Sequence, residues 1–171
     1  MAERSDNLQR PNIQNSSPDD REVVFHAHVD GHTSVWVMDV TESRTTRVTD
    51  LEIAETYPLW SPDGSHVVFR WMLDRRLYQV PRGGGDPEVL TEGPVFYPQV
   101  SSDGRHYYFT NFSTEDIWEV PVGGGQERRV TDFSGKRGGL GNTALATDGT
   151  YLYFTWEDEL GDIWVMDVTR E

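Results

Sequence analysis

Hydrophobic positions along the chain fall in short runs of β-branched and aromatic residues, separated by Gly, Pro and Asp. Such runs are typical of β-strands joined by turns, and no stretch shows the 3.6-residue period of an amphipathic helix. Four of the runs end in Phe, and each follows a polar corner that contains Asp. The corners and their runs are Ser17-Pro18-Asp19-Asp20 with Val23-Val24-Phe25, Ser61-Pro62-Asp63-Gly64 with Val67-Val68-Phe69, Ser101-Ser102-Asp103-Gly104 with Tyr107-Tyr108-Phe109, and Ala146-Thr147-Asp148-Gly149 with Leu152-Tyr153-Phe154.

A second run in each repeat is centred on an aromatic residue, in turn Trp36, Tyr78, Trp118 and Trp164. These residues are separated by 42, 40 and 46 positions, a spacing typical of propeller blades. A turn follows, spelled Gly-Gly-Gly in the middle two repeats, and then a short run that ends in Val-Thr or Leu-Thr. With an inner strand before each corner, every repeat predicts a four-stranded antiparallel unit.

One such sheet cannot bury both of its faces, whereas sheets stacked radially can. The predicted fold class is therefore all-β, a β-propeller of about four blades, with the Phe residues of the repeats between neighbouring blades. The approximate blades span residues 17–50, 57–91, 96–131 and 143–171.

The pattern Y-P-x-W-S-P-D-G-x-x-V-V-F, followed by D-I-W-x-V-x-V-G-G-G and R-x-V-T-D, resembles the WD40-like repeat of TolB-type propellers. Similar repeats occur in the propellers of tricorn protease and of prolyl-oligopeptidase-like peptidases. The resemblance runs from about Ser17 to Val168 and implies the fold, but no single function, because this fold hosts unrelated activities. It would also allow a periplasmic location if a signal had been removed.

The sequence at the two ends of the chain is compatible with more than one way of closing the ring. The fourth repeat stops at Asp167 to Glu171, where its outer strand should begin. In the N-terminal segment, residues 1–16, positions 7–10 could form an outer strand and 12–15 an inner one. If this segment supplies the closing strand of the last blade, no strand edge stays open. TolB-type relatives usually have six or more blades, so we consider a small ring, two half-rings paired as a homodimer, and an excised part.

Composition narrows the classes of partner. The 29 acidic against 15 basic residues give a formal charge of -14, which repels nucleic acid and anionic lipid surfaces. The chain has no cysteine, so thiol nucleophiles, disulfides and Cys-based zinc sites are excluded. Residues 1–20 lack the apolar core of a signal peptide, and no stretch has the roughly 18 apolar residues of a membrane helix. We expect a soluble chain without membrane insertion, without a cofactor and with no compartment assigned.

The Asp-Gly corners are predicted to be turns and not a site. Asp bonds backbone amides two residues on, Pro sets the entry dihedral, and Gly accepts the left-handed conformation. Asp20 in place of Gly, and Thr147 in place of Pro, are changes that a turn tolerates.

Three histidines suggest a different site. His26, His28 and His32 alternate around Asp30, and alternate residues of a strand share one face, so they could hold zinc or a similar ion. The competing interpretation is that Asp30-Gly31 closes a hairpin, which interrupts the alternation and leaves a surface or packing role.

Loops offer the best candidates for binding. In a propeller, the loops after the Phe strands and after the outer strands emerge on one face, and the longest of them is the insertion Asp132 to Asn142. Large aromatic residues beside basic ones in an acidic protein are typical of a protein-contact surface. The candidate residues are Trp71, Arg75, Arg76, Asn111, Phe112, Lys136, Arg137, Asn142 and Trp156. In the alternative, Trp71 and Trp156 cap the core between blades.

The sequence favours a non-enzymatic binding or scaffold module, which engages a protein, a peptide or another copy of itself through the loop face. Homo-oligomers through blade edges are also considered. One alternative is an enzyme or its associated propeller, either the gating domain of a peptidase or a metal-assisted lyase or hydrolase. A third is a structural or designed repeat protein whose role is self-assembly. No G-x-S-x-G elbow is present, so no catalytic residue is predicted.

Overall fold

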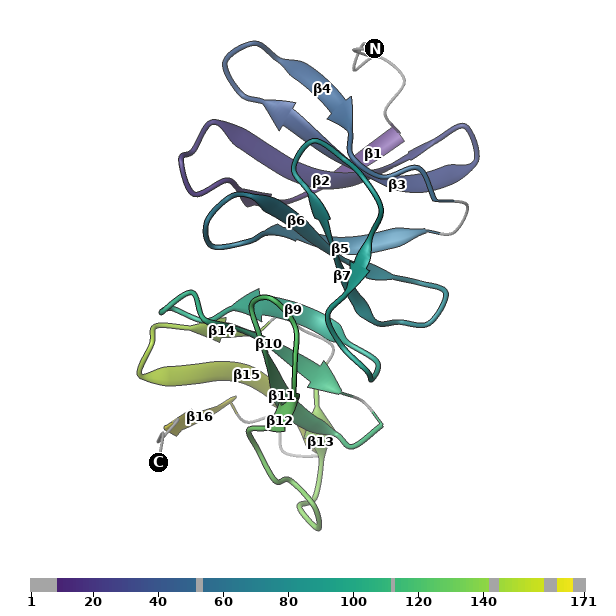
Figure 1. Cartoon of the computed structure of the whole chain (residues 1–171). Helices are drawn as coiled ribbons and strands as arrows, with labels where there is room; N and C mark the ends of the chain where they lie inside the picture. The colour runs from purple at the N-terminus through teal and green to yellow at the C-terminus, as the bar shows by residue number, and fades with distance from the viewer. Residues whose placement is uncertain (1–8, 52–53, 112, 142–144, 159–162, 168–171) are drawn as a thin grey trace. The chain divides into compact units, whose positions relative to one another are not determined.

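The structure is a computed structural model that describes residues 9–51, 54–111, 113–141, 145–158 and 163–167. In these ranges all regular secondary structure is β-strand, arranged as four antiparallel sheets (Figure 1). The predicted all-β propeller class is confirmed. Within the same ranges, no helix is long and apolar enough to cross a membrane.

The first sheet includes part of the N-terminal segment. Its strands are, in order, β1 (Gln9–Ser16), β2 (Glu22–Val29), β3 (His32–Asp39) and β4 (Arg44–Arg47). Because β1 pairs with β2 along its length, residues 9–16 form the inner strand of this sheet. Of positions 7–10, considered above for an outer strand, 9 and 10 belong to this inner strand instead, and 7 and 8 lie outside the described residues. Closure of the last blade by residues 1–16 stays a prediction.

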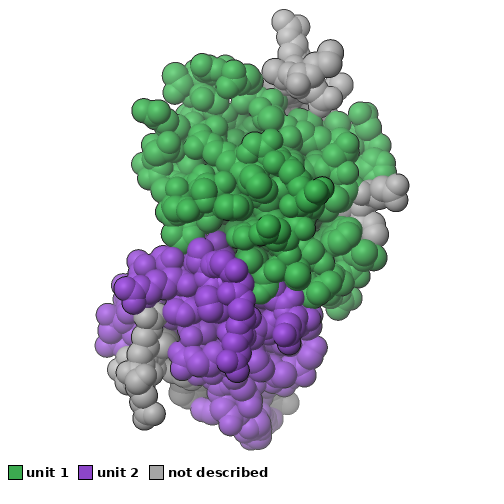
Figure 2. Space-filling model, in the orientation of Figure 1, with its two compact units in different colours: residues 1–90 green, residues 91–171 purple. Residues whose placement is uncertain are grey.

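The second sheet repeats this order. It comprises β5 (Glu55–Trp60), β6 (His66–Trp71), β7 (Leu77–Pro81) and β8 (Glu88–Val89). The first two sheets make up one compact unit, residues 1–90, and the remainder of the chain makes up a second, residues 91–171 (Figure 2).

The second unit contains the other two sheets. The third sheet comprises β9 (Phe96–Val100), β10 (His106–Asn111), β11 (Asp116–Pro121) and β12 (Arg128–Arg129). The fourth comprises β13 (Gly139–Leu140), β14 (Ala146–Thr147), β15 (Tyr151–Glu157) and β16 (Ile163–Asp167). β13 and β14 pair in succession with β15, and β16 also pairs with β15. The inner strand of this sheet is thus built in two pieces.

Each unit has a hydrophobic core that draws on both of its sheets. In the first unit, Val24 and Val35 of the first sheet pack in one cluster with Trp60, Phe69 and Tyr78 of the second. In the second unit, one cluster joins the third sheet to the fourth through Tyr108, Ile117, Leu152, Phe154 and Trp156. All four Phe residues of the repeat are buried, as the period-2 pattern of apolar positions predicts.

The corners of the first three repeats are turns, and their shared chemistry explains the shared sequence. In the second repeat, the Ser61 hydroxyl donates to Asp63 at 2.6 Å and accepts from the His66 amide at 2.9 Å. Gly64 closes the turn at φ 69°, where the left-handed conformation favours glycine. Hydrogen bonds from the Ser61 hydroxyl and from the Ser65 amide and hydroxyl hold the pKa of Asp63 at about 2, so this carboxylate is committed to the turn.

The R-x-V-T-D pattern also has a structural basis. Thr49 and Thr131 follow the outer strands of their sheets, and each hydroxyl accepts the amide of the neighbouring strand, from Val35 at 3.0 Å and from Ile117 at 2.9 Å. The hydroxyls satisfy backbone donors that would otherwise be buried without a partner.

Candidate functional site

The loop between β6 and β7, residues 71–76, is a tight hairpin closed at its base. The Trp71 amide donates to the Arg76 carbonyl at 3.1 Å, and the Arg75 amide donates to the Trp71 carbonyl at 2.8 Å. Arg75 completes the turn in the left-handed region, at φ 63°. The Met72 amide donates to the Ala54 carbonyl at 2.9 Å, which ties the loop to the residue before β5. We call residues 71–76 the β6–β7 loop.

A network of side chains fixes the shape of this loop. The Asp74 carboxylate accepts hydrogen bonds from Arg76 Nε at 2.6 Å and from the Tyr78 hydroxyl at 2.7 Å. Partial burial disfavours the charge on Asp74, but the hydrogen bonds from Tyr78 and Arg76 outweigh burial and hold its pKa below the usual value. The hydrogen bond to Asp74 in turn raises the pKa of Arg76. Arg76 therefore stabilises the conformation of the loop through its hydrogen bond to Asp74.

Apolar side chains occupy the tip of the loop. Met72 is 41% exposed and Leu73 is 60% exposed, and Arg75 beside them is exposed as well. Trp71 is half-buried, packs against the core and meets Tyr78 edge-on with ring centroids 5.4 Å apart. Sequence reasoning named Trp71 and the arginines but missed Met72 and Leu73. Two consecutive apolar residues inside a predicted hairpin loop were the signal that could have found them.

The candidates of the second unit form a separate cluster. Trp156 is only 7% exposed, donates from Nε1 to the Arg137 carbonyl at 3.0 Å and packs on Phe133 at a centroid distance of 4.7 Å. Lys136 is exposed, with its ammonium 6.0 Å from the centre of the Phe133 ring. Trp156 thus holds the core and the insertion together, which is the capping role named as the alternative.

Asn111 has a structural role, because its side-chain oxygen accepts the Ser113 amide at 2.9 Å in the turn after β10. Phe112 and Asn142, the other two candidates, lie outside the described residues. The β6–β7 loop and the Trp156 cluster belong to different units, so a single loop face that contains both stays a prediction.

The three histidines do not converge. Strand β2 turns back at Asp30-Gly31, and His32 of β3 pairs with Val29 while His28 pairs with Thr33. Because paired residues share a face and neighbours alternate, His32 lies on the opposite face of the sheet from His26 and His28. Among the residues that the structure describes, no group of three His, Cys, Asp or Glu side chains could hold a metal ion.

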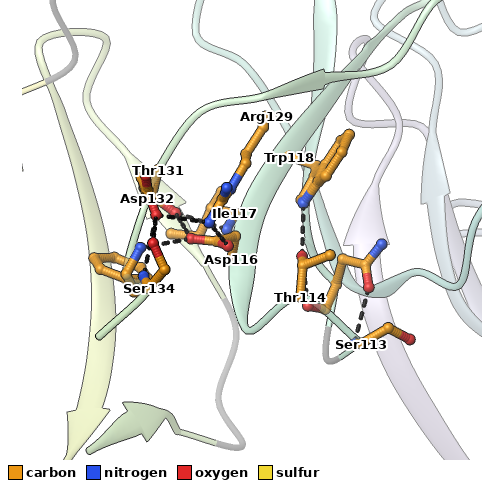
Figure 3. A network of polar contacts seen from close by, with 11 residues as sticks. Ser113, Thr114, Asp116, Ile117, Trp118, Arg129, Thr131, Asp132 and Ser134 are labelled. Carbon is orange, nitrogen blue, oxygen red and sulfur yellow. Dashed lines mark hydrogen bonds and ion pairs between the residues drawn. The ribbon is translucent and has the colours of Figure 1, made fainter. Parts of the chain in front are cut away.

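A buried carboxylate anchors the insertion in the second unit (Figure 3). Asp116, fully buried at the start of β11, accepts from Thr131 at 3.1 Å, from the Phe133 amide at 2.9 Å and from Arg129 at 2.5 Å. Arg129 also contacts Asp132 at 2.8 Å. Asp116 has three donors and no exposure, so it is a structural residue that the D-I-W pattern did not reveal.

A second buried carboxylate lies beside the β6–β7 loop. Glu55, with no exposed surface, is the first residue of β5 and pairs with Trp71 across the sheet. Burial raises the pKa of Glu55 to about 7, although the Thr49 hydroxyl and the Arg47 charge act in the opposite direction. The protonation of Glu55, at the strand position opposite Trp71, therefore changes near neutral pH.

Comparison with known proteins supports the fold. No protein-family model matches the sequence. TolB from Acinetobacter baumannii is similar over 94% of this chain and 42% of its own, with 17% identity and a TM-score of 0.74. A putative TolB from Agrobacterium tumefaciens is similar over 94% of this chain and 62% of its own, with 22% identity and a TM-score of 0.74.

An oligogalacturonate lyase in complex with manganese is also similar, over 90% of this chain and 48% of its own, with 15% identity and a TM-score of 0.65. The chain thus spans between 42% and 62% of the length of these three structures. Since an enzyme is among them, the fold does not choose between binding and catalysis. The comparisons confirm the predicted resemblance to TolB-type propellers at the level of the fold.

Proposed function

We propose that this chain is a non-enzymatic binding module that engages a protein or peptide partner through the β6–β7 loop. The observation that carries the proposal is that the loop has an exposed apolar tip, Met72 and Leu73, and that hydrogen bonds to Asp74 fix its conformation. A loop already fixed in one conformation loses little entropy on binding, so more of its contact energy contributes to affinity.

The composition of the loop fits a protein or peptide partner. Aromatic residues, Met and Arg are enriched in protein interfaces, and the loop contains Trp71, Met72 and Arg75. The net charge of -14 disfavours nucleic acid. Because the three histidines do not converge, the described residues do not support the alternative of a metal-assisted lyase.

The test is a selection of peptides against the wild-type chain from a phage-displayed random library. We expect the enriched peptides to lose at least about tenfold in affinity for a Met72→Ser/Leu73→Ser variant, because the apolar contact area at the tip is removed. Both positions are exposed, so the variant should keep the circular dichroism spectrum of the folded chain.

A matched control removes apolar area elsewhere. Val40 and Val89 are 51% and 48% exposed and lie outside the loop, so Val40→Ser/Val89→Ser should bind the selected peptides as the wild type does. Peptides that do not distinguish the loop variant from the control would contradict the proposal, and so would a library from which nothing is enriched.

The same variants test self-association. The formation of homo-oligomers through blade edges stays a prediction. The mass of the wild-type chain in solution gives its oligomeric state and so tests this prediction. Loss of an oligomer in the loop variant alone would identify a second copy as the partner.

A further inference from the structure

A small pocket of about 330 Å³ opens on the third sheet, in the second unit. Its volume lies at the lower end of the range for small-molecule sites. The lining residues come from the start of β10, from β11, from β12 and from the turn before β12. They are His106, Glu119, Pro121, Gln126, Glu127 and Arg128.

Two buried polar atoms of this lining have no hydrogen-bond partner among the described residues. Glu119 is 5% exposed, and its Oε1 accepts from Arg128 Nε at 2.9 Å, while its Oε2 has no partner. Nδ1 of His106, an acceptor in the tautomer that carries its proton on Nε2, has none either. A buried acceptor without a donor is costly, and a carboxylate oxygen especially so. Both atoms would gain a partner from a ligand that donates hydrogen bonds.

The second sheet provides an internal comparison. Its residues at the same register positions are His66, Gln79, Pro81 and Glu88, because His66 pairs with Pro81 and Gln79 pairs with Glu88, as His106 does with Pro121 and Glu119 with Arg128. There, His66 Nδ1 contacts the Ser65 hydroxyl at 2.7 Å and Gln79 Nε2 donates to Glu88 at 3.2 Å. The second sheet thus lacks the unpartnered atoms that the third sheet has at these register positions.

Charge indicates which donor fits. Glu119 and Glu127 face a single cation, Arg128, whose Nε is already paired with Glu119. Glu127 is fixed as well, since its Oε1 accepts the amides of Glu92 at 2.5 Å and Gly93 at 3.3 Å. The two carboxylates outnumber the one guanidinium of the lining, a formal excess of one negative charge. An anion would therefore be repelled, and a cationic donor would be attracted.

We propose that this pocket binds a primary ammonium group, which donates to Glu119 Oε2 and His106 Nδ1. An ammonium is compact and has three donors, as many as two acceptors can use. The group could come from a free alkylamine or from a lysine side chain of a peptide. The proposal does not depend on the β6–β7 loop.

The test is a titration of the isotope-labelled chain, followed by NMR at neutral pH and constant ionic strength. Butylammonium is compared with butanol, its neutral counterpart, and Nα-acetyl-lysine methylamide with Nα-acetyl-norleucine methylamide. We expect saturable shifts of the His106 and Glu119 amides with the ammonium compounds only. Binding of butylammonium alone would assign a free amine, and binding of the lysine compound would assign a peptide side chain.

Two variants test the mechanism. Glu119→Gln removes the charge but keeps the shape, and Gln79 shows that glutamine fits this register position. We expect it to weaken ammonium binding by about tenfold or more, because a charge-assisted hydrogen bond is lost. Glu88→Gln, an exposed change in the second sheet, should leave binding unchanged. Equal shifts with butanol, no binding of either ammonium compound, or unchanged affinity in Glu119→Gln would overturn the proposal.

Discussion

Among single residues, Glu55 makes the stability of the fold depend on pH near neutrality. It is buried, and its pKa rises from 4.5 to about 7 in the folded chain. Because the folded state binds this proton more tightly than the unfolded chain does, the contribution to stability is greatest below pH 4.5 and is lost as the pH rises through about 7. The full shift corresponds to about 3 kcal/mol.

We predict that Glu55→Gln makes stability less dependent on pH. Glutamine keeps the shape of the side chain but cannot ionise, so urea unfolding midpoints at about pH 5 and about pH 8 should differ less than in the wild type. At about pH 8, the urea unfolding midpoint of Glu55→Gln should be higher than that of the wild type. Glu88→Gln, on the exposed outer strand, is the control and should preserve the wild-type difference. A Glu55→Gln variant with an unchanged pH profile would show that Glu55 is not the titrating group.

Among the elements, the insertion after β12 has a polar anchor in Asp116, beside its contact with Trp156. The three donors to Asp116 come from Arg129, Thr131 and Phe133, all within or just before the insertion. Gly138, near its end, is at φ 98°, and a side chain there would collide with Trp156 and Glu157. Residues 132–141, the described part of the insertion, are therefore held against β11 and β15.

We predict that Asp116→Ala loosens the insertion and destabilises the fold by about 3 kcal/mol, since buried donors lose their acceptor. Limited trypsin digestion should then cut first at Lys136 or Arg137. The control is Asp50→Ala, which removes an 85%-exposed carboxylate from its pair with Arg47 and should cost about 0.5 kcal/mol or less. Equal protease resistance in the two variants would argue against the anchoring role.

For the whole molecule, the dominant electrostatic feature is the formal charge of -14. Mutual repulsion of like charges disfavours the compact state, and dissolved salt screens it. The clusters that define each unit are apolar and therefore much less sensitive to salt.

We predict that raising NaCl from about 20 mM to about 500 mM at neutral pH increases the melting temperature by about 2–4 °C, the shift expected for about 1 kcal/mol in a chain of this size. Differential scanning calorimetry measures the change. Glu55→Gln should show the same salt response as the wild type, because burial and not repulsion raises the pKa of Glu55. A melting temperature that falls with salt would mean that attractive ion pairs outweigh the repulsion.

The sequence by itself determined the repeat, the strands and the turns, because these depend on local chemistry. The Ser61 and Asp63 corner needs only neighbouring amides, and the alternation around Phe69 and Phe109 needs only the period of a strand. The strands predicted around Phe69 and Phe109 are therefore observed, as β6 and β10, whereas the bounds of the blades stay a prediction.

Only the tertiary structure decided which side chains are free to bind. Trp71 and Trp156 look alike in the sequence, yet one borders an exposed loop tip and the other is buried under Phe133. The excess of acidic residues likewise concealed Glu55, Asp116 and Glu119, which differ only in what surrounds them. Burial and hydrogen-bond partners come from residues distant in the chain, so a local pattern cannot specify them.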